Sequence, residues 1–384
     1  MRFHGWSGGA LTALLTLGTA LAGQVGLSTP QASLRSGHGA APAAGPAPSA
    51  DPAAPSRHPA REAEAPAPCR SAHELTAQGS ATQEPTPQAP AVSIEPVTLE
   101  GEIQALRVAV DGAPFTTLHL NGRIPFLHPV LGPTGAPMTR GFPMEPGPLD
   151  ARDHPHHQSL WVAHGDVAGL DFWHDPQCAI RLAGAPVVEG GRVTVPLEWV
   201  GPGERVVLRE SRRLEFGAEE GRRWIDQRCE FLATEEGVTF GDTKEGSFAV
   251  RLRPELRVDG EHAVGTLRSS EGREGKATWG KPARWMHCEG VVGEERLSLT
   301  LFDHPTNPRH PTRWHSRTYG LVAANPFGLH HFTGSAKGEG ALAVGTESPR
   351  AFRHLIVLRA APADAAGPDP EHLDREAAAF AKDA

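Results

Sequence analysis

The segment Arg192-Val-Thr-Val-Pro-Leu-Glu-Trp199 decides the fold class of this 384-residue chain. Large apolar side chains occupy every second position of it, at Val193, Val195, Leu197 and Trp199. Successive side chains of a β-strand point to opposite faces of its sheet. A period of two therefore predicts a strand with one buried face.

The same alternation recurs on both sides of this segment. Glycine- and proline-rich turns such as Gly201-Pro202-Gly203 separate most of the apolar stretches, and no helical pattern lies between them. Further strands are predicted at residues 103–110, 204–216, 222–232, 247–253, 297–302 and 353–359. Many short strands in succession predict an all-β fold, an antiparallel β-sandwich.

One helix is predicted, at the C-terminal end. Asp369 is suited to cap it and Pro370 to occupy its first turn. Leu373, Ala377 and Phe380 then form an apolar stripe, with which the helix is expected to dock on the outside of the sandwich.

The N-terminal quarter of the chain differs in composition from the rest. Residues 1–22 combine Arg2, an apolar run and the small residues Ala20-Leu-Ala22, which predicts a signal peptide, with an uncleaved anchor as the alternative. Residues 23–92 are rich in Ala and Pro and predict a disordered linker. Residues 93–384 then form one domain, and the protein is expected to be exported, to the periplasm or the extracellular space.

Charge and cysteine content exclude several classes of protein. The net charge is −8, which gives no electrostatic footprint for nucleic acid. No later stretch is apolar for long enough to give the mature chain a transmembrane span. The four cysteines form no Cys-x-x-Cys pair, so a zinc ribbon is excluded. Export permits disulfides without requiring them. The oligomeric state stays open.

Three segments rich in ionisable residues fit neither strands nor ordinary turns. They are 140–174, which contains Asp153-His-Pro-His-His157, then 241–248, which contains Lys244-Glu245, and finally 303–328, which contains Asp303-His-Pro and Trp314-His315. Half of the 20 histidines lie in or beside these segments. Histidine exchanges protons near neutral pH, and so many ionisable groups in a few loops indicate a functional site.

Particular residues are candidates for particular roles. Those predicted to take part in catalysis are His156, His157, Glu245, His304, Arg313 and His315. Those predicted to bind the ligand are Arg140, Asp153, His154, Trp161, Asp166, Asp171, Trp173 and Asn325. Aromatic rings can cover the C–H face of a sugar while polar groups meet its hydroxyls. For any single histidine, tying down a rigid loop is the alternative role.

A metal site is not predicted, although a divalent metal remains possible. His156 and His157 are adjacent, so in a strand they would point to opposite faces. His154 and His156 could share one face. The chain has no His-Glu-x-x-His motif.

The three segments together resemble one known family. The resemblance rests on the stretches 153–161, 163–166 and 171–173, on Lys244-Glu245-Gly246, and on the stretches 303–315 and 324–328. These motifs are similar to those of the PmoA-like family of bacterial proteins, over residues 95–360. The resemblance implies a β-sandwich of the galactose mutarotase supersandwich type, and by analogy a sugar-like ligand.

The function expected from these patterns is an enzyme that acts on a carbohydrate or a sugar derivative. Histidine and Glu245 would transfer protons, arginines would stabilise negative charge, and no redox cofactor is predicted. An epimerase, a lyase or a hydrolase would fit. The alternatives are a non-catalytic glycan-binding module and a metal-dependent oxidoreductase.

Overall fold

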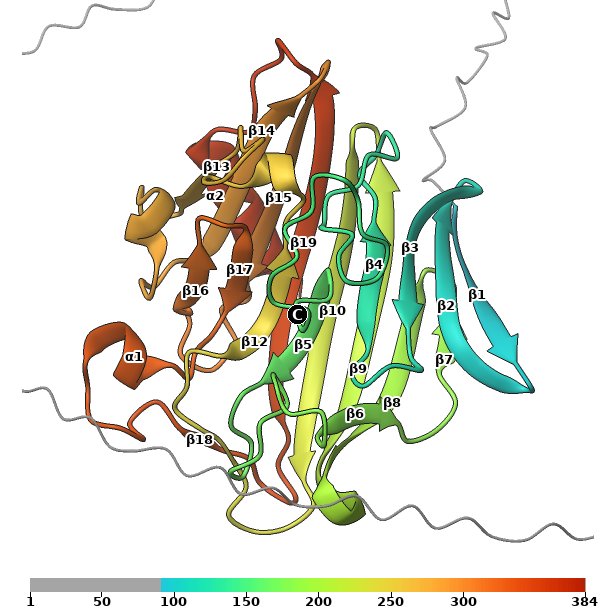
Figure 1. Ribbon diagram of the computed structural model, residues 1–384, viewed down its shortest axis with the longest axis vertical. Helices are drawn as coiled ribbons and strands as arrows, with labels where there is room; N and C mark the ends of the chain where they lie inside the picture. The colour runs from blue at the N-terminus through green and yellow to red at the C-terminus, as the bar shows by residue number, and fades with distance from the viewer. Residues whose placement is uncertain (1–90, 384) are drawn as a thin grey trace, which may run out of the picture. The chain divides into compact units, whose positions relative to one another are not determined.

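The computed structural model describes residues 91–383, which fold around two large antiparallel sheets (Figure 1). The strands of the eight-stranded sheet, in spatial order, are β1 (Val92–Leu99), β2 (Glu102–Val110), β3 (Ala113–His119), β4 (Phe126–Val130), β5 (Leu160–His164), β12 (Gly246–Arg251), β17 (Leu321–Ala324) and β16 (Trp314–Arg317). β12 thus joins the first half of the chain to the C-terminal hairpin of β16 and β17.

The second sheet has nine strands. In spatial order they are β13 (Thr266–Ser269), β14 (Trp285–Val292), β15 (Glu295–Asp303), β19 (Arg350–Pro362), β10 (Arg222–Ala233), β9 (Arg205–Glu219), β8 (Arg192–Gly201) and β6 (Ala179–Leu182), with β7 (Val187–Glu189) also paired to β8. A small third sheet pairs β11 (Thr239–Phe240) with β18 (Leu342–Ala343).

Helices are short in the part of the chain that the structure describes. The α-helices are α1 (Leu329–Thr333) and α2 (Pro370–Phe380), and the 3-10 turns are Pro202–Glu204, Pro254–Leu256 and Gly275–Thr278. Between residues 91 and 383, no helix is both long and apolar enough to cross a membrane.

The hydrophobic core lies between the two large sheets. The four apolar residues of the segment that begins at Arg192 are buried in β8, and Trp199 faces Phe248 of the other sheet across a small internal cavity. His164 and His354 also border this cavity, so His164 points into the core although it belongs to the segment 140–174. Two facing antiparallel sheets confirm the predicted β-sandwich.

The C-terminal helix is confirmed. It covers side chains of the nine-stranded sheet that the alternating strand pattern alone would predict to be exposed to solvent. Leu373 and Phe380 of α2 pack on Trp285 and Phe302, which point away from the core between the sheets. This second cluster explains why β15 is buried on both faces although its sequence alternates. Periodicity along one strand carries no information about a helix that docks later in the chain.

The cap of α2 gives a first testable prediction. The Asp369 side chain accepts a hydrogen bond of 2.7 Å from the backbone N–H of His372. Asp369→Ala removes this cap and is expected to lower the free energy of unfolding by about 1 kcal/mol in urea titrations. Asp364→Ala, in the exposed turn before the helix, is the control. Equal stability of the two variants would contradict the capping role.

Several predictions concern residues outside those described. The predicted signal peptide, all but the last two residues of the predicted linker, and Cys69 lie there. Val92, the last residue of that linker, is the first residue of β1. Cys178, Cys229 and Cys288 are buried as free thiols.

Candidate functional site

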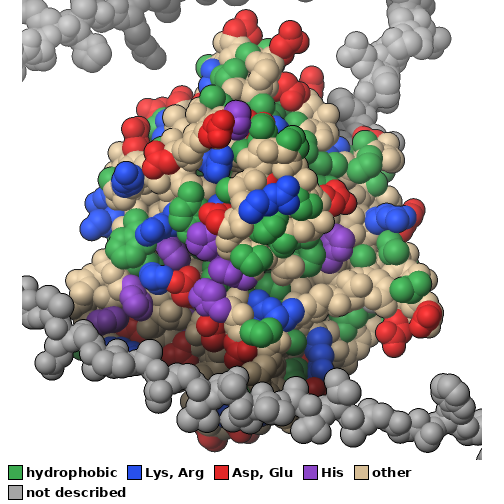
Figure 2. All heavy atoms as spheres, viewed as in Figure 1, with side chains coloured by type: hydrophobic (Ala, Val, Ile, Leu, Met, Phe, Trp, Pro, Cys, Tyr) green, Lys and Arg blue, Asp and Glu red, His purple; other side chains and the backbone are tan. Residues whose placement is uncertain are grey.

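The outer face of the eight-stranded sheet carries a row of residues in register across four strands. Phe248 points into the core, so its neighbour Ala249 points outwards, opposite Trp161 on one side and Ala323 on the other. Ala323 in turn lies opposite His315. Three strand spacings place the Cα atoms of Trp161 and His315 about 14 Å apart. Figure 2 shows that histidines gather on this face, with acidic and basic side chains among them.

Four histidines form a continuous chain of ring contacts on this face. Ring centroids lie 4.7 Å apart between His154 and His157, 4.5 Å between His157 and His156, and 4.6 Å between His156 and His174. We call these four residues the histidine cluster. The aromatic rings in contact with it are Trp161, Trp173 and Tyr319.

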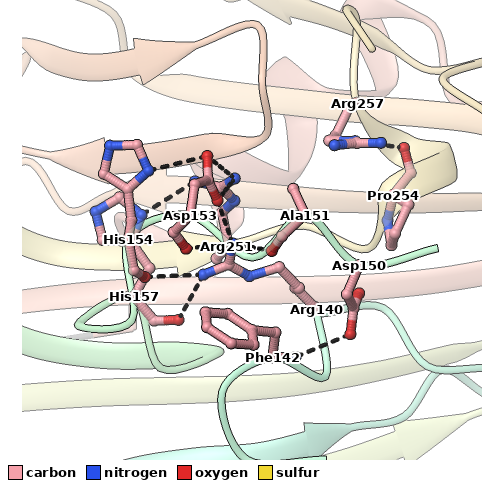
Figure 3. Close-up of polar contacts among 10 residues, drawn as sticks. All are labelled: Arg140, Phe142, Asp150, Ala151, Asp153, His154, His157, Arg251, Pro254 and Arg257. Atoms are coloured by element: carbon pink, nitrogen blue, oxygen red, sulfur yellow. Dashed lines mark hydrogen bonds and ion pairs between the residues drawn. The ribbon is translucent and has the colours of Figure 1, made fainter. Parts of the chain in front are cut away.

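Two buried arginines hold the loop that carries this cluster (Figure 3). Arg140 donates to the Asp153 carboxylate at 2.6 Å and to four backbone carbonyls between residues 151 and 157. Arg251, from β12, donates to Asp153 at 2.8 Å and to Nδ1 of His157 at 3.1 Å. The loop conformation is therefore set by guanidinium groups beneath it, and Arg140 supports the site instead of facing a ligand.

Burial and charge determine the protonation of this loop. Burial, together with His174, lowers the pKa of His156 to about 4. Burial also lowers the pKa of His157 far below its ordinary value. Partial burial opposes ionisation of Asp153, but Arg251, His154 and Arg140 together outweigh it through their charges and hydrogen bonds, and the pKa of Asp153 is held at about 2. At neutral pH the site thus presents two uncharged imidazoles next to an ionised carboxylate.

Asp171 and His174 form an oriented acid–imidazole pair. One carboxylate oxygen of Asp171 accepts the backbone N–H groups of Trp173 and His174, at 2.8 and 2.9 Å. The other oxygen lies 3.0 Å from Nδ1 of His174. A carboxylate in this position fixes the tautomer and direction of an imidazole. Nε2 of His174 is left for a ligand, on a side chain that is 45% exposed.

Gly165 brings the segment 241–248 against this pair. It donates its N–H to the carbonyl of Glu245 at 2.7 Å. A Cβ atom on Gly165 would lie 2.9 Å from Cβ of Glu245 and 3.6 Å from Oδ1 of Asp171, so only glycine allows this approach. Lys244 pairs with Glu245 and lies beside the buried side chain of His315. Lys244 and Glu245 therefore link the first segment to the third.

The residues of the third segment, 303–328, lie beside two different sheets. His315 and Tyr319 reach the outer face described above, whereas His304 packs edge-on against Phe380 of α2, with 4.8 Å between ring centroids. Asp303 accepts hydrogen bonds from nearby groups, among them the His310 ring at 2.7 Å. The first half of this segment thus lies beside the nine-stranded sheet, and the structure does not bring His304 to the histidine cluster.

Three other predicted site residues bond to the backbone around them. Arg313 donates to the carbonyl of Gly280 at 2.8 Å. Asp166 accepts the N–H of Gly169 at 3.0 Å. Asn325 is fully buried and accepts hydrogen bonds from two amides of the turn that follows it. These hydrogen bonds to the backbone stabilise the conformations of the loops around the three residues. Trp161 and Trp173 are likewise buried and support the histidines from below.

Sequence reasoning did not select three residues that the structure places in or beside the cluster. These are Arg251, Tyr319 and His174. The available signal for Arg251 was a charged residue at an outward position of an otherwise apolar predicted strand. Tyr319 is the single tyrosine of the chain, and its guanidinium partner Arg251 lies 4.4 Å from its ring centre.

The histidines of this face are not arranged as the ligands of a metal ion. Among residues 91–383, no three His, Cys, Asp or Glu side chains are arranged to hold an ion. The near-parallel stacking of His154 on His157, with 12° between the ring planes, keeps their lone pairs from converging.

Comparisons with solved structures give distant likenesses. Among solved structures, a GH36 α-galactosidase from Geobacillus stearothermophilus, in complex with raffinose, is similar at 10% identity and a TM-score of 0.25. The alignment covers 68% of this chain and 40% of that enzyme, so the protein spans less than half of the enzyme's length. A likeness this distant carries no argument about activity. No curated protein matches the sequence.

The family comparison corrects the resemblance drawn from the loop motifs. The model that matches describes a family of unknown function, and it matches residues 105–368. The assignment to the PmoA-like family is therefore wrong. The matched region contains the histidine cluster and both arginines beneath it, and it spans well over half of the sequence, so the chain belongs to the family of unknown function DUF6807.

Proposed function

We propose that the outer face of the eight-stranded sheet is the active site of an exported enzyme that transfers protons on a carbohydrate or sugar derivative. The observation that carries this proposal is the histidine cluster, in which Asp171 orients His174 against His156. Neighbouring imidazoles of this kind can each exchange a proton with a ligand or with solvent. No redox cofactor is part of the proposal.

The protonation states suit acid–base chemistry. His156 is uncharged at neutral pH because burial holds its pKa near 4, so its ring offers a ligand one donor and one acceptor. The Asp171 carboxylate lies against Nδ1 of His174, so Nε2 is the atom of this ring that would exchange a proton with a ligand. Glu245, next to Asp171 across Gly165, supplies a second carboxylate. These three side chains are the proposed catalytic groups.

The polarity of the face favours a ligand rich in hydroxyl groups. Asp153, His154 and His174 are each partly exposed and together offer both donors and acceptors. Trp161 and Trp173, by contrast, are buried and offer no exposed platform. A glycan-binding module that relies on stacking would need such a platform, and its absence among these residues favours the enzyme.

A pair of histidine variants tests the proposal. His174→Ala is expected to lower turnover about a hundredfold, because an oriented proton-transfer group is lost. The measurement is product formation by NMR with a panel of neutral and acidic glycans, beside a thermal melt that reports folding. His262→Ala is the matched control, since His262 is also 45% exposed but lies in a loop elsewhere.

Three outcomes would contradict acid–base catalysis at this site. They are equal turnover by the two variants, saturable glycan binding without any product, and absence of both binding and product for the whole panel. The second outcome would favour the binding module.

A further inference from the structure

One basic side chain of the outer face, that of Arg317, lacks a counter-charge. Arg317 is the last residue of β16 and follows His315 by two positions, so it points to the same side of the sheet as the row from Trp161 to His315. The side chain is exposed. Among residues 91–383, no carboxylate lies within ion-pair distance of its guanidinium group. This cation is therefore free to bind an anionic group of a ligand.

The acidic side chains of the candidate site are already engaged. Asp153 binds the two buried arginines beneath the cluster loop, at 2.6 and 2.8 Å. Asp171 accepts two backbone N–H groups and contacts an imidazole. Glu245 pairs with its neighbour Lys244. None of these groups balances Arg317, so a ligand that covers this end of the face is expected to bring the negative charge itself.

The ring of Tyr319 places this guanidinium group beside the histidine cluster. The centre of the ring lies 5.7 Å from Cζ of Arg317 and 5.2 Å from the centre of the His154 ring. A single aromatic ring thus separates the cation from the cluster, and one ligand can touch both. A guanidinium group that lies over a ring uses its face, so its N–H donors project from its edge and can bind an oxyanion in parallel.

The turn that carries Tyr319 is held by backbone hydrogen bonds. The N–H of Gly320 donates to the carbonyl of Arg317 at 2.9 Å, and the φ angle of Gly320 is +95°. The carbonyl of Thr318 accepts two further N–H groups, at 3.0 Å each, from the segment 258–259. The backbone around the cation is therefore ordered before a ligand arrives, which limits the entropy lost on binding.

A second cation lies next to Arg317. Burial and the charge of Arg317 both lower the pKa of Lys244, whose side chain is 38% exposed. Burial, followed by the charges of Lys244 and Arg317, lowers the pKa of His315 to about 3. The two cations therefore act on each other and on the same buried imidazole. An anion that lies near both relieves this repulsion.

We propose that Arg317 binds an oxyanion of the substrate, so that the sugar derivative taken by this face is an acidic one. A uronic acid, a sulfate ester and a phosphate ester of a sugar share this chemistry. Arg317 is then a residue that determines specificity, with Lys244 as a neighbouring positive charge. This inference rests on the proposed function and extends it to the charge of the substrate.

Calorimetry with the full chain tests the inference. The probes are methyl glycosides of glucose, galactose and mannose, each as the neutral sugar, the uronic acid, the 6-sulfate and the 6-phosphate. At least one acidic form is expected to bind about tenfold more tightly than its neutral counterpart, and the form that binds best identifies the oxyanion. This advantage should shrink when the salt concentration rises from about 50 to about 300 mM, because ions screen exposed charges.

Variants of exposed arginines assign the effect to one residue. Arg317→Gln is expected to abolish the preference for the acidic form, a loss of about tenfold in its affinity. Arg317→Lys keeps the charge without the planar fork and should restore part of the preference. Arg107→Gln is the matched control, since Arg107 of β2 is also exposed and has no ion pair in the described part of the chain. It should bind like the unmodified protein.

The outcomes separate this inference from the proposed function. If acidic and neutral probes bind equally, or if Arg317→Gln keeps the preference, the role of Arg317 is wrong, and loss of turnover in His174→Ala still supports the active site. If the preference depends on Arg317 while His174→Ala leaves turnover intact, the acidic ligand stands without the proposed catalysis. If no probe binds, both are wrong.

Discussion

Arg140→Met is expected to lower the free energy of unfolding by about 3–5 kcal/mol, because several buried acceptors lose their donor at once. Arg140 is 2% exposed and is bound by Asp153 and by four carbonyl groups of one loop. Methionine fills a similar volume without a single donor. The carbonyl groups would have to recruit water or move, and the loop that carries the histidine cluster would lose its fixed conformation.

Urea unfolding measures the loss of stability, and hydrogen exchange of residues 151–157 measures the loosening of the loop. Arg209→Met is the matched control, since Arg209 is 67% exposed and pairs with Glu198 at a distance of 3.6 Å. An exposed pair contributes well below 1 kcal/mol. Similar unfolding free energies for the two variants, or unchanged exchange in the loop, would contradict the role assigned to Arg140.

Acid is expected to unfold the protein through two histidines in the core. Burial lowers the pKa of His164 and of His354 to about 4, from an ordinary value of 6.5. Below pH 6.5 the unfolded chain binds protons at these positions and the folded chain does not, so stability falls as the pH falls. Each group contributes about 1.4 kcal/mol per pH unit. Over the whole titration the two together remove about 7 kcal/mol, of which about 5 kcal/mol is lost between pH 6.5 and 4, a large part of the stability of an ordinary domain.

Unfolding free energies measured at half-unit steps between pH 7.5 and 4 test this expectation. His354→Gln keeps a polar side chain but cannot titrate, so the slope should become shallower by about 1.4 kcal/mol per pH unit. His262→Gln, in an exposed loop, should retain the original slope. A slope that is the same in all three proteins would show that His354 does not carry the acid sensitivity.

The elements were more predictable than the site. Predicted strands at 192–199 and 222–232 correspond to β8 and β10, because a half-buried strand must alternate whatever its neighbours are. The helix α2 was predictable from Asp369 and Pro370, which act within one turn. Each of these signals is local, so no knowledge of the fold was needed to read them.

The site depended on side-chain direction, which short polar loops do not encode by periodicity. His164 and His156 belong to the same segment, yet one projects into the core and the other lies in the cluster. His304 and His315 belong to another segment and end beside different sheets. His128, which lies in an apolar strand, gave no signal that its buried ring would lack hydrogen-bond partners among residues 91–383.

The sequence by itself determined that strands alternate, where turns interrupt them, and which segments concentrate ionisable groups. These properties follow from backbone geometry and from the free energy of burying apolar side chains, both of which act over a few residues. Only the tertiary structure decided which of the groups meet. Pairing of β5 with β12 and of β12 with β17 is long-range, and the anchoring of the cluster loop by Arg140 and Arg251 exists only once those strands lie side by side.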